Sequence, residues 1–329
     1  MKKFVVGVLL LALAAAVFAD DALVLPKGVL RTYFTGAYAF FDQEWDSTGE
    51  KVDVAGFDSL SLINVGGAVE FGVIDWISAA VQWAPGWNVW STTENGTPPY
   101  DRLLANGSFD IFAGAKIQVI GPKAPVASEK IRLAAAPGVK IPLPPPDWEQ
   151  ERANQTSGTE NFIAESLDKH VLGLGLRAYF DYVLSKMFYL NLYSEFIYYP
   201  VADKRENVSL TDWTLVNVAL QSNYDVEFGY DLTLEAEPHF EMMFGNGMRL
   251  GVGVPITYTM SPEIVRDGTA VADTDSYLLS VSPNVSLFLT KFFIPTEIKV
   301  GYTLPLVGQN TKATNTVVVQ LKTYLRFYK

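Results

Sequence analysis

The chain has 329 residues, with 25 lysine or arginine, 36 aspartate or glutamate and no cysteine, and its formal net charge is −11. This acidic balance argues against nucleic-acid binding, which depends on Lys and Arg contacts to phosphate. The lack of cysteine excludes disulfides, thiolate chemistry and Cys-ligated zinc, and two histidines cannot supply a three-histidine metal site. After residue 19 no apolar run reaches about 18 residues, which excludes a helical membrane protein but leaves a β-barrel open.

Residues 1–19 have the pattern of a secretory signal peptide. Lys2 and Lys3 form a short basic region, residues 4–18 are apolar, and residues 17–19 (Val-Phe-Ala) fit a small-residue cleavage site. Because 1–19 carry two Lys and no acidic residue, the mature chain is more acidic, at about −13. We therefore predict a cleaved signal and one exported domain, residues 20–329.

Apolar and polar residues alternate with period two through most of this domain, as they do in β-strands. In 63–73, for example, Ile63, Val65 and Val69 share one face, and Asn64 and Glu70 share the other. Twelve segments follow this pattern: 28–42, 60–74, 76–90, 106–120, 130–143, 170–183, 188–200, 222–243, 248–260, 276–290, 294–306 and 315–328.

The joints between these segments alternate in length. Short joints lie around residues 74–75, 184–186, 245–247 and 291–292, whereas long polar joints include 43–59, 144–169 and 201–221. Short turns at one end and long loops at the other are typical of an outer-membrane barrel. We predict an all-β, transmembrane, antiparallel up-and-down β-barrel of about 12 strands (10–14 fit the pattern), with both termini on the periplasmic side and long extracellular loops.

Two local features bear on this architecture. Pro142, Pro255 and Pro305 are expected to end strand pairing at the extracellular rim, because proline cannot donate to a ladder. The loop 144–169 is a candidate to fold into the mouth, as a gating loop or as surface decoration. A soluble sandwich or propeller is the structural alternative, but such folds use shorter strands with evenly spaced turns.

Four stretches of the chain resemble a known family. These are residues 25–28 (Leu-Pro-Lys-Gly), 71–76 (Phe-Gly-Val-Ile-Asp-Trp), 108–116 (Ser-Phe-Asp-Ile-Phe-Ala-Gly-Ala-Lys) and 136–142 (Ala-Pro-Gly-Val-Lys-Ile-Pro). They are similar to the meta-pathway phenol-degradation-like outer-membrane family, which is loosely compared with hydrophobic-compound transporter barrels. The resemblance covers mainly residues 25–143. It implies an outer-membrane channel for aromatic or hydrocarbon compounds, and it carries over no catalytic residue.

In a membrane barrel the polar face of each strand points into the lumen. Parity along the strands gives these lumen-lining candidates: Glu70, Asp110, Lys116, Arg132, Lys140, Arg177, Asp181, Glu195, Asp225, Glu227, Asp231, Glu235, Glu237, His239, Glu241, Arg249 and Lys299. They favour a polar pore with a narrow charged constriction, while a largely occluded barrel braced by ion pairs remains the alternative. We predict no catalytic residue, cofactor or metal site. A histidine hydrogen-bonded to a carboxylate explains Glu237, His239 and Glu241 better than a bound cation does.

These patterns favour a channel or transporter for small solutes in the outer membrane. Polar lumen charges argue for hydrophilic solutes, whereas the family resemblance argues for hydrophobic or aromatic ones. The alternative is a structural or adhesive surface barrel. A lipid-processing enzyme is less favoured, because no serine of the same parity is evident beside His170 and because His239 lies on the lumen side among acidic residues. The expected partners are outer-membrane lipid, a small-molecule solute and the outer-membrane assembly machinery, with no nucleic acid.

Overall fold

The computed structural model describes residues 21–54, 59–93, 101–143, 165–166, 169, 171–200, 202–204, 224–245 and 247–327. The predicted signal peptide 1–19 and most of the loop 144–169 lie outside these residues. Within them, no helix is long and apolar enough to cross a membrane.

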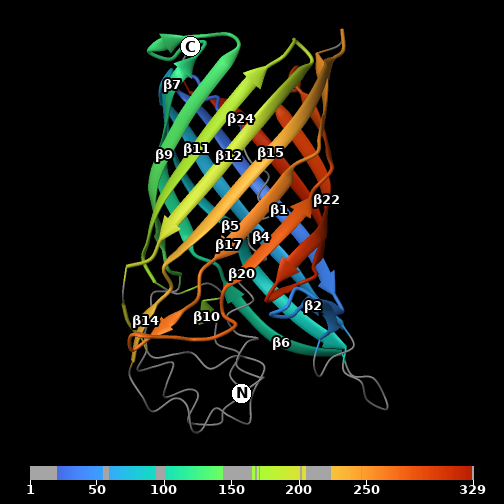
Figure 1. Ribbon diagram of the computed structural model, residues 1–329. Helices are drawn as coiled ribbons and strands as arrows, with labels where there is room; N and C mark the ends of the chain where they lie inside the picture. Colours follow the sequence, from blue (N-terminus) through green and yellow to red (C-terminus); the bar gives the residue numbers. More distant parts are fainter. Residues whose placement is uncertain are drawn as a thin grey trace.

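In the part of the chain that the structure describes, the main element is a closed antiparallel barrel of 12 strands (Figure 1). Three wall strands are each built of two segments, β6 with β7, β16 with β17, and β20 with β21. The barrel strands are β1 (Val29–Phe41), β4 (Ser59–Ile74), β5 (Ile77–Thr93), β6 (Asp101–Ser108), β7 (Ile111–Gly121), β9 (Ile131–Ile141), β11 (Gly173–Val183), β12 (Phe188–Tyr198), β15 (Tyr230–Met243), β16 (Met248–Gly253), β17 (Ile256–Ser261), β20 (Ser276–Val281), β21 (Asn284–Leu289), β22 (Thr296–Gln309) and β24 (Asn315–Arg326). Antiparallel pairing of β1 with β24 closes the wall.

The joints alternate between tight turns and long loops, as predicted. Figure 1 shows the C-terminus at one end of the barrel, which we call the tight-turn end, and the short strands β2, β10 and β14 at the other, the long-loop end. Two small sheets lie outside the wall: β2 (Gln43–Trp45), β3 (Lys51–Asp53) and β23 (Thr311–Lys312) form one, and β13 (Ala202–Lys204), β14 (Tyr224–Glu227), β18 (Val265–Arg266) and β19 (Thr269–Ala270) form the other. Short strands β8 (Val126–Ala127) and β10 (Glu165–Ser166) run parallel to β7 and β6.

The burial pattern is the inverse of that in a water-soluble protein. Along β24, the side chains of Val319 and Leu321 are 47% and 40% exposed, whereas Gln320 and Lys322 between them are only 5% and 9% exposed. Apolar side chains therefore cover the outside and polar ones fill the inside, which is the arrangement of a wall that faces lipid. The predicted fold class, an outer-membrane type of up-and-down barrel, is confirmed.

One predicted strand is wrong at its start. The segment 222–243 breaks at Gly229, which has a φ of +67°, and only the part from Tyr230 joins the wall. Asp225 and Glu227 belong to β14 in the four-stranded sheet outside the barrel, where both are exposed. They are therefore not lumen-lining residues. A small sheet has the same period of two as a barrel strand, so alternation alone could not separate the two.

The proline prediction holds for one of three positions. Pro142 directly follows β9, so pairing ends there. Pro255 instead lies between β16 and β17, its carbonyl accepts from Ser282 N, and pairing resumes in β17. Pro305 lies inside β22, opposite Ser280. Pro255 and Pro305 each remove one donor but leave a carbonyl available, so the ladder continues on either side of them.

Candidate functional site: the barrel lumen

The lumen contains a cavity of about 220 Å³, lined by side chains from wall strands on every side of the barrel. Its lining combines aromatic rings, such as Phe109, Phe112 and Tyr193, with charged groups, such as Lys140 and Asp231. The candidates that the structure places on the inward face of the wall are Glu70, Asp110, Lys116, Arg132, Lys140, Arg177, Asp181, Glu195, Asp231, Glu235, Glu237, His239, Glu241, Arg249 and Lys299.

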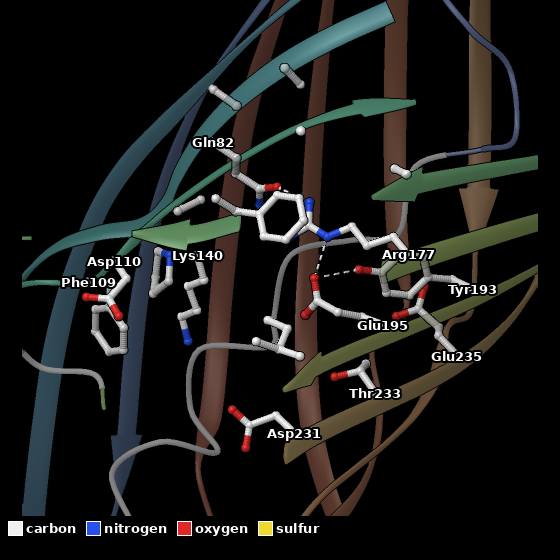
Figure 2. Close-up of a pocket in the computed structure, with 18 of the residues that line it drawn as sticks. Gln82, Phe109, Asp110, Lys140, Arg177, Tyr193, Glu195, Asp231, Thr233 and Glu235 are labelled. Carbon is white, nitrogen blue, oxygen red and sulfur yellow. Dashed lines mark hydrogen bonds and ion pairs between the residues drawn. The ribbon is translucent and has the colours of Figure 1, made fainter. Parts of the chain in front are cut away.

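Arg177 makes contacts with three other wall strands (Figure 2). Its Nε donates to the Glu195 carboxylate on β12, and Nη1 donates to Gln82 Oε1 on β5 at 2.7 Å. The guanidinium carbon lies 3.7 Å from the ring centroid of Phe112 on β7, which is a cation–π contact. Tyr193 OH also donates to Glu195, at 3.2 Å. These contacts fix the position of the largest cation in the cavity wall.

The ring of Phe112 packs against the backbone of three glycines. A Cβ on Gly138 would lie 2.5 Å from Phe112 Cζ, and one on Gly175 would also collide with this ring. A Cβ on Gly114 would be 3.2 Å from Phe112 Cε1. Because β7, β9 and β11 are neighbours, these three glycines form one patch of bare backbone. A larger residue at Gly138 or Gly175 would therefore displace the Phe112 ring, which lines the cavity. Sequence reasoning missed Phe112, although its parity with Asp110 and Gly114 indicates an inward side chain.

The chain before β1 lies inside the barrel. Ala22 N donates to both carboxylate oxygens of Asp181 at 3.1 Å, and Gln118 Nε2 donates to Ala22 O at 2.9 Å. Lys116 Nζ donates to the carbonyl of Asp21. Ala22 is fully buried and packs with Ala134, Ala136 and Tyr179. This segment, residues 21–24, was not predicted, and it fills part of the lumen beside the cavity, which Ala136 and Tyr179 also line.

Inward charges elsewhere are engaged with each other. Arg31 pairs with Glu70, which also accepts from Ser78 Oγ. Arg132 Nη1 lies 3.5 Å from Asp181 Oδ2, and Lys322 Nζ lies 3.8 Å from Glu297 Oε1. Buried charges require such partners. The lumen is therefore braced by ion pairs across neighbouring strands.

His239 lies in a chain of polar groups towards the tight-turn end. Its Nδ1 is 2.9 Å from Glu237 Oε1, its Nε2 is 3.9 Å from Glu241 Oε1, and Arg249 Nη1 is 3.3 Å from Glu241 Oε2. The ring stacks on Tyr189 with centroids 4.6 Å apart. Among the described residues, no group of three or more His, Asp and Glu side chains is arranged to hold a metal ion. The geometry fits a histidine held by a carboxylate.

Comparisons with known proteins give a fold rather than a family. No family model matches the chain, and neither does any curated protein. An outer membrane channel from Pseudomonas putida F1 has a similar structure, with a TM-score of 0.61 and 15% identity over 94% of this chain and 100% of that chain. The β domain of the Bordetella autotransporter BrkA gives a TM-score of 0.45 with 8% identity over 89% and 98% of the two chains. A Pseudomonas aeruginosa FadL homologue gives a TM-score of 0.38 with 11% identity over 98% of each chain. The first of these likenesses shows that the chain has the fold of an outer-membrane β-barrel.

Proposed function

We propose that the protein is an outer-membrane channel or transporter for small solutes, with hydrophobic or aromatic compounds as its preferred class. The observation that carries this proposal is the lumen cavity of about 220 Å³. Phe109, Phe112 and Tyr193 give it aromatic walls, while Arg177 and Glu195 beside them are engaged with each other. A cavity of this kind fits one small, partly apolar molecule better than a continuous stream of hydrated ions.

Two parts of the chain that lie in or at one end of the lumen support a gated path. Residues 21–24 occupy the side of the lumen formed by β7, β9 and β11, and the buried side chain of Lys169 lies at the long-loop end. In this proposal the long loops face the cell exterior and the tight turns face the periplasm, as in outer-membrane barrels generally. A solute then has to displace or pass at least one of these two segments.

The same proposal assigns the cellular setting. The chain is exported by the signal 1–19, the outer-membrane assembly machinery inserts residues 20–329 as one barrel domain, and lipid surrounds its apolar outer face. No catalytic activity, cofactor or nucleic-acid partner is expected. The alternative role, a structural or adhesive surface barrel, requires no passage through the lumen.

Solute flux into proteoliposomes tests this function. Refolded residues 20–329 are expected to admit benzoate and benzylammonium, which are small and aromatic, faster than sucrose. Gly175→Leu is expected to reduce that flux at least about tenfold, because the new side chain forces Phe112 into the cavity. Gly245→Leu is the matched control, since a Cβ at Gly245 would have no atom within 4 Å, and its flux is expected to equal that of the wild type. A folded wild-type barrel that admits no solute would overturn the proposal and favour the adhesive role.

A further inference from the structure

Lys169 places an ammonium group between two aromatic rings at the long-loop end of the lumen. Its side chain is only 3% exposed and pairs with the carboxylate of Asp231. The Nζ atom lies 4.3 Å from the ring centroid of Tyr199 and 5.7 Å from that of Phe228. Two ring faces and a carboxylate around one cation are the elements by which proteins recognise organic ammonium ions.

The groups that surround this ammonium are fixed by the barrel. Tyr199 OH donates to Asp231 Oδ2 at 2.6 Å, and Ser261 Oγ donates to Asp231 Oδ1 at 2.5 Å. Tyr199 is 1% exposed and meets Phe228 edge to face, with centroids 6.3 Å apart. Tyr199 follows β12, Asp231 and Ser261 belong to β15 and β17, and Phe228 lies between β14 and β15. Lys169 comes from the connection between β9 and β11. The binding groups are therefore built without Lys169, which supplies only the cation.

This cluster borders the lumen cavity. Asp231, Ser261 and Lys140 all line the cavity, and Figure 2 shows Asp231 and Lys140 among its lining side chains. Lys140 Nζ donates to Tyr199 OH at 3.0 Å, so it binds the hydroxyl edge of that ring, while Lys169 lies closer to the ring centroid. A molecule that enters from the long-loop end meets this cluster before it reaches Phe112 and Arg177.

We propose that Tyr199, Phe228 and Asp231 form a binding site for an organic ammonium ion, and that Lys169 occupies it in this structure. The inference rests on the proposed function, because it names the solute class that enters the channel: amines with an apolar body. The lysine side chain is itself a butylammonium group attached to the chain. A free amine must compete with this tethered group, whose effective concentration is in the millimolar range or above.

A second buried lysine provides the comparison. Lys312 is 2% exposed, pairs with Glu44 between β23 and β2, and lies at the same end of the molecule. Its Nζ is 6.0 Å from the ring of Phe41, and Lys312 is absent from the cavity lining. If a buried ion pair alone accounted for affinity towards amines, Lys312→Ala and Lys169→Ala would behave alike.

Chemical complementation with n-butylammonium tests the site. Lys169→Ala in refolded residues 20–329 is expected to bind n-butylammonium, measured by calorimetry, about tenfold or more tightly than the wild type or Lys312→Ala does. The neutral analogue 1-butanol is expected to bind at least tenfold more weakly, and Asp231→Asn in the Lys169→Ala background is expected to remove the affinity for the amine. In planar bilayers, Lys169→Ala is expected to conduct more than the wild type, and n-butylammonium is expected to reverse the increase.

The outcomes separate this inference from the proposed function. Equal binding of n-butylammonium by Lys169→Ala, Lys312→Ala and the wild type, or equal binding of 1-butanol, would overturn the ammonium site even where solute flux is normal. Tight binding of n-butylammonium without flux of any solute would support the site and overturn the transport role. Folding is checked by the shift of the unheated barrel on a gel, and Lys169→Met, which keeps the apolar stem, takes the place of Lys169→Ala if that variant does not fold.

Discussion

The segment 21–24 inside the lumen leads to a quantitative prediction about its release. One of its charge-assisted anchors is the Asp181 carboxylate, which is 1% exposed and accepts from Ala22 N through both oxygens at 3.1 Å. In Asp181→Asn one oxygen still accepts, so the bond changes from a charged one, which contributes about 1.5–3 kcal/mol, to a neutral one, which contributes about 0.5–1.5 kcal/mol. The loss of about 1.4 kcal/mol corresponds to a tenfold increase in the released population.

Cysteine labelling measures this population directly, because the natural chain has no cysteine. Ala22→Cys places a thiol at a fully buried position, and Phe293→Cys, at a side chain 99% exposed, gives the labelling rate of a fully accessible thiol. The ratio of the two maleimide labelling rates reports the fraction of time for which the segment is out of the lumen. We expect Asp181→Asn to raise the Ala22→Cys rate about tenfold.

Asp75→Asn is the matched control for this experiment. Asp75 Oδ1 accepts from Lys27 N at 3.1 Å, so it is also a carboxylate bound to a backbone amide, but one that lies just after the segment 21–24. It lies at the tight turn with its side chain 50% exposed, and we expect its removal to change the labelling rate less than twofold. If Ala22→Cys already reacts as fast as Phe293→Cys, or if both aspartate variants behave alike, then Asp181 does not hold the segment in the lumen.

Three further predictions concern the wall and the loops. Arg177→Met leaves Glu195 without its ion-pair partner and is expected to lower the free energy of unfolding by about 3–5 kcal/mol in urea titrations. Addition of Glu195→Gln should restore most of the lost stability, and no recovery would contradict the pairing argument. Val319→Arg, at an outward position 47% exposed in β24, is expected to lower the free energy of unfolding by about 2–4 kcal/mol because the position faces lipid. Val52→Arg, in the exposed strand β3, should change it by no more than about 0.5 kcal/mol. Equal losses of stability in the two variants would place Val319 away from lipid. In the β2–β3 turn, a hydrogen bond from the Thr48 hydroxyl is the main cause that lowers the pKa of Asp46. The turn is therefore stabilised above the usual aspartate pKa of about 3.9 and loses this stabilisation as the pH falls through the lower folded-state value. NMR titration of the Thr48 amide checks this, and a titration midpoint at the usual aspartate pKa would refute it.

The strands and the parity of their side chains could be predicted from the sequence because alternation is a local property. In 131–141, Arg132 and Lys140 are placed inward by their neighbours alone, and the structure has the same strand as β9. The segment 21–24 could not be found in this way, because its partners Gln118 and Asp181 lie 96 and 159 residues away. The ammonium site at Asp231 also joins separate segments. Contacts of this kind depend on register and closure rather than on any local pattern.

The register explains why counting charges did not identify the solute class. The inward charges suggested a hydrophilic pore when each strand was considered alone, but neighbouring strands bring Arg31 to Glu70 and Arg177 to Glu195. Once opposite charges are adjacent, their fields largely cancel at the distance of a solute in the cavity. In the proposed channel, the groups that remain to select a solute are the aromatic rings, of which Phe112 lies over glycines of three strands, and the carboxylate of Asp231 in the ammonium site. The ion pairs therefore brace the wall, and the aromatic rings line the space between them.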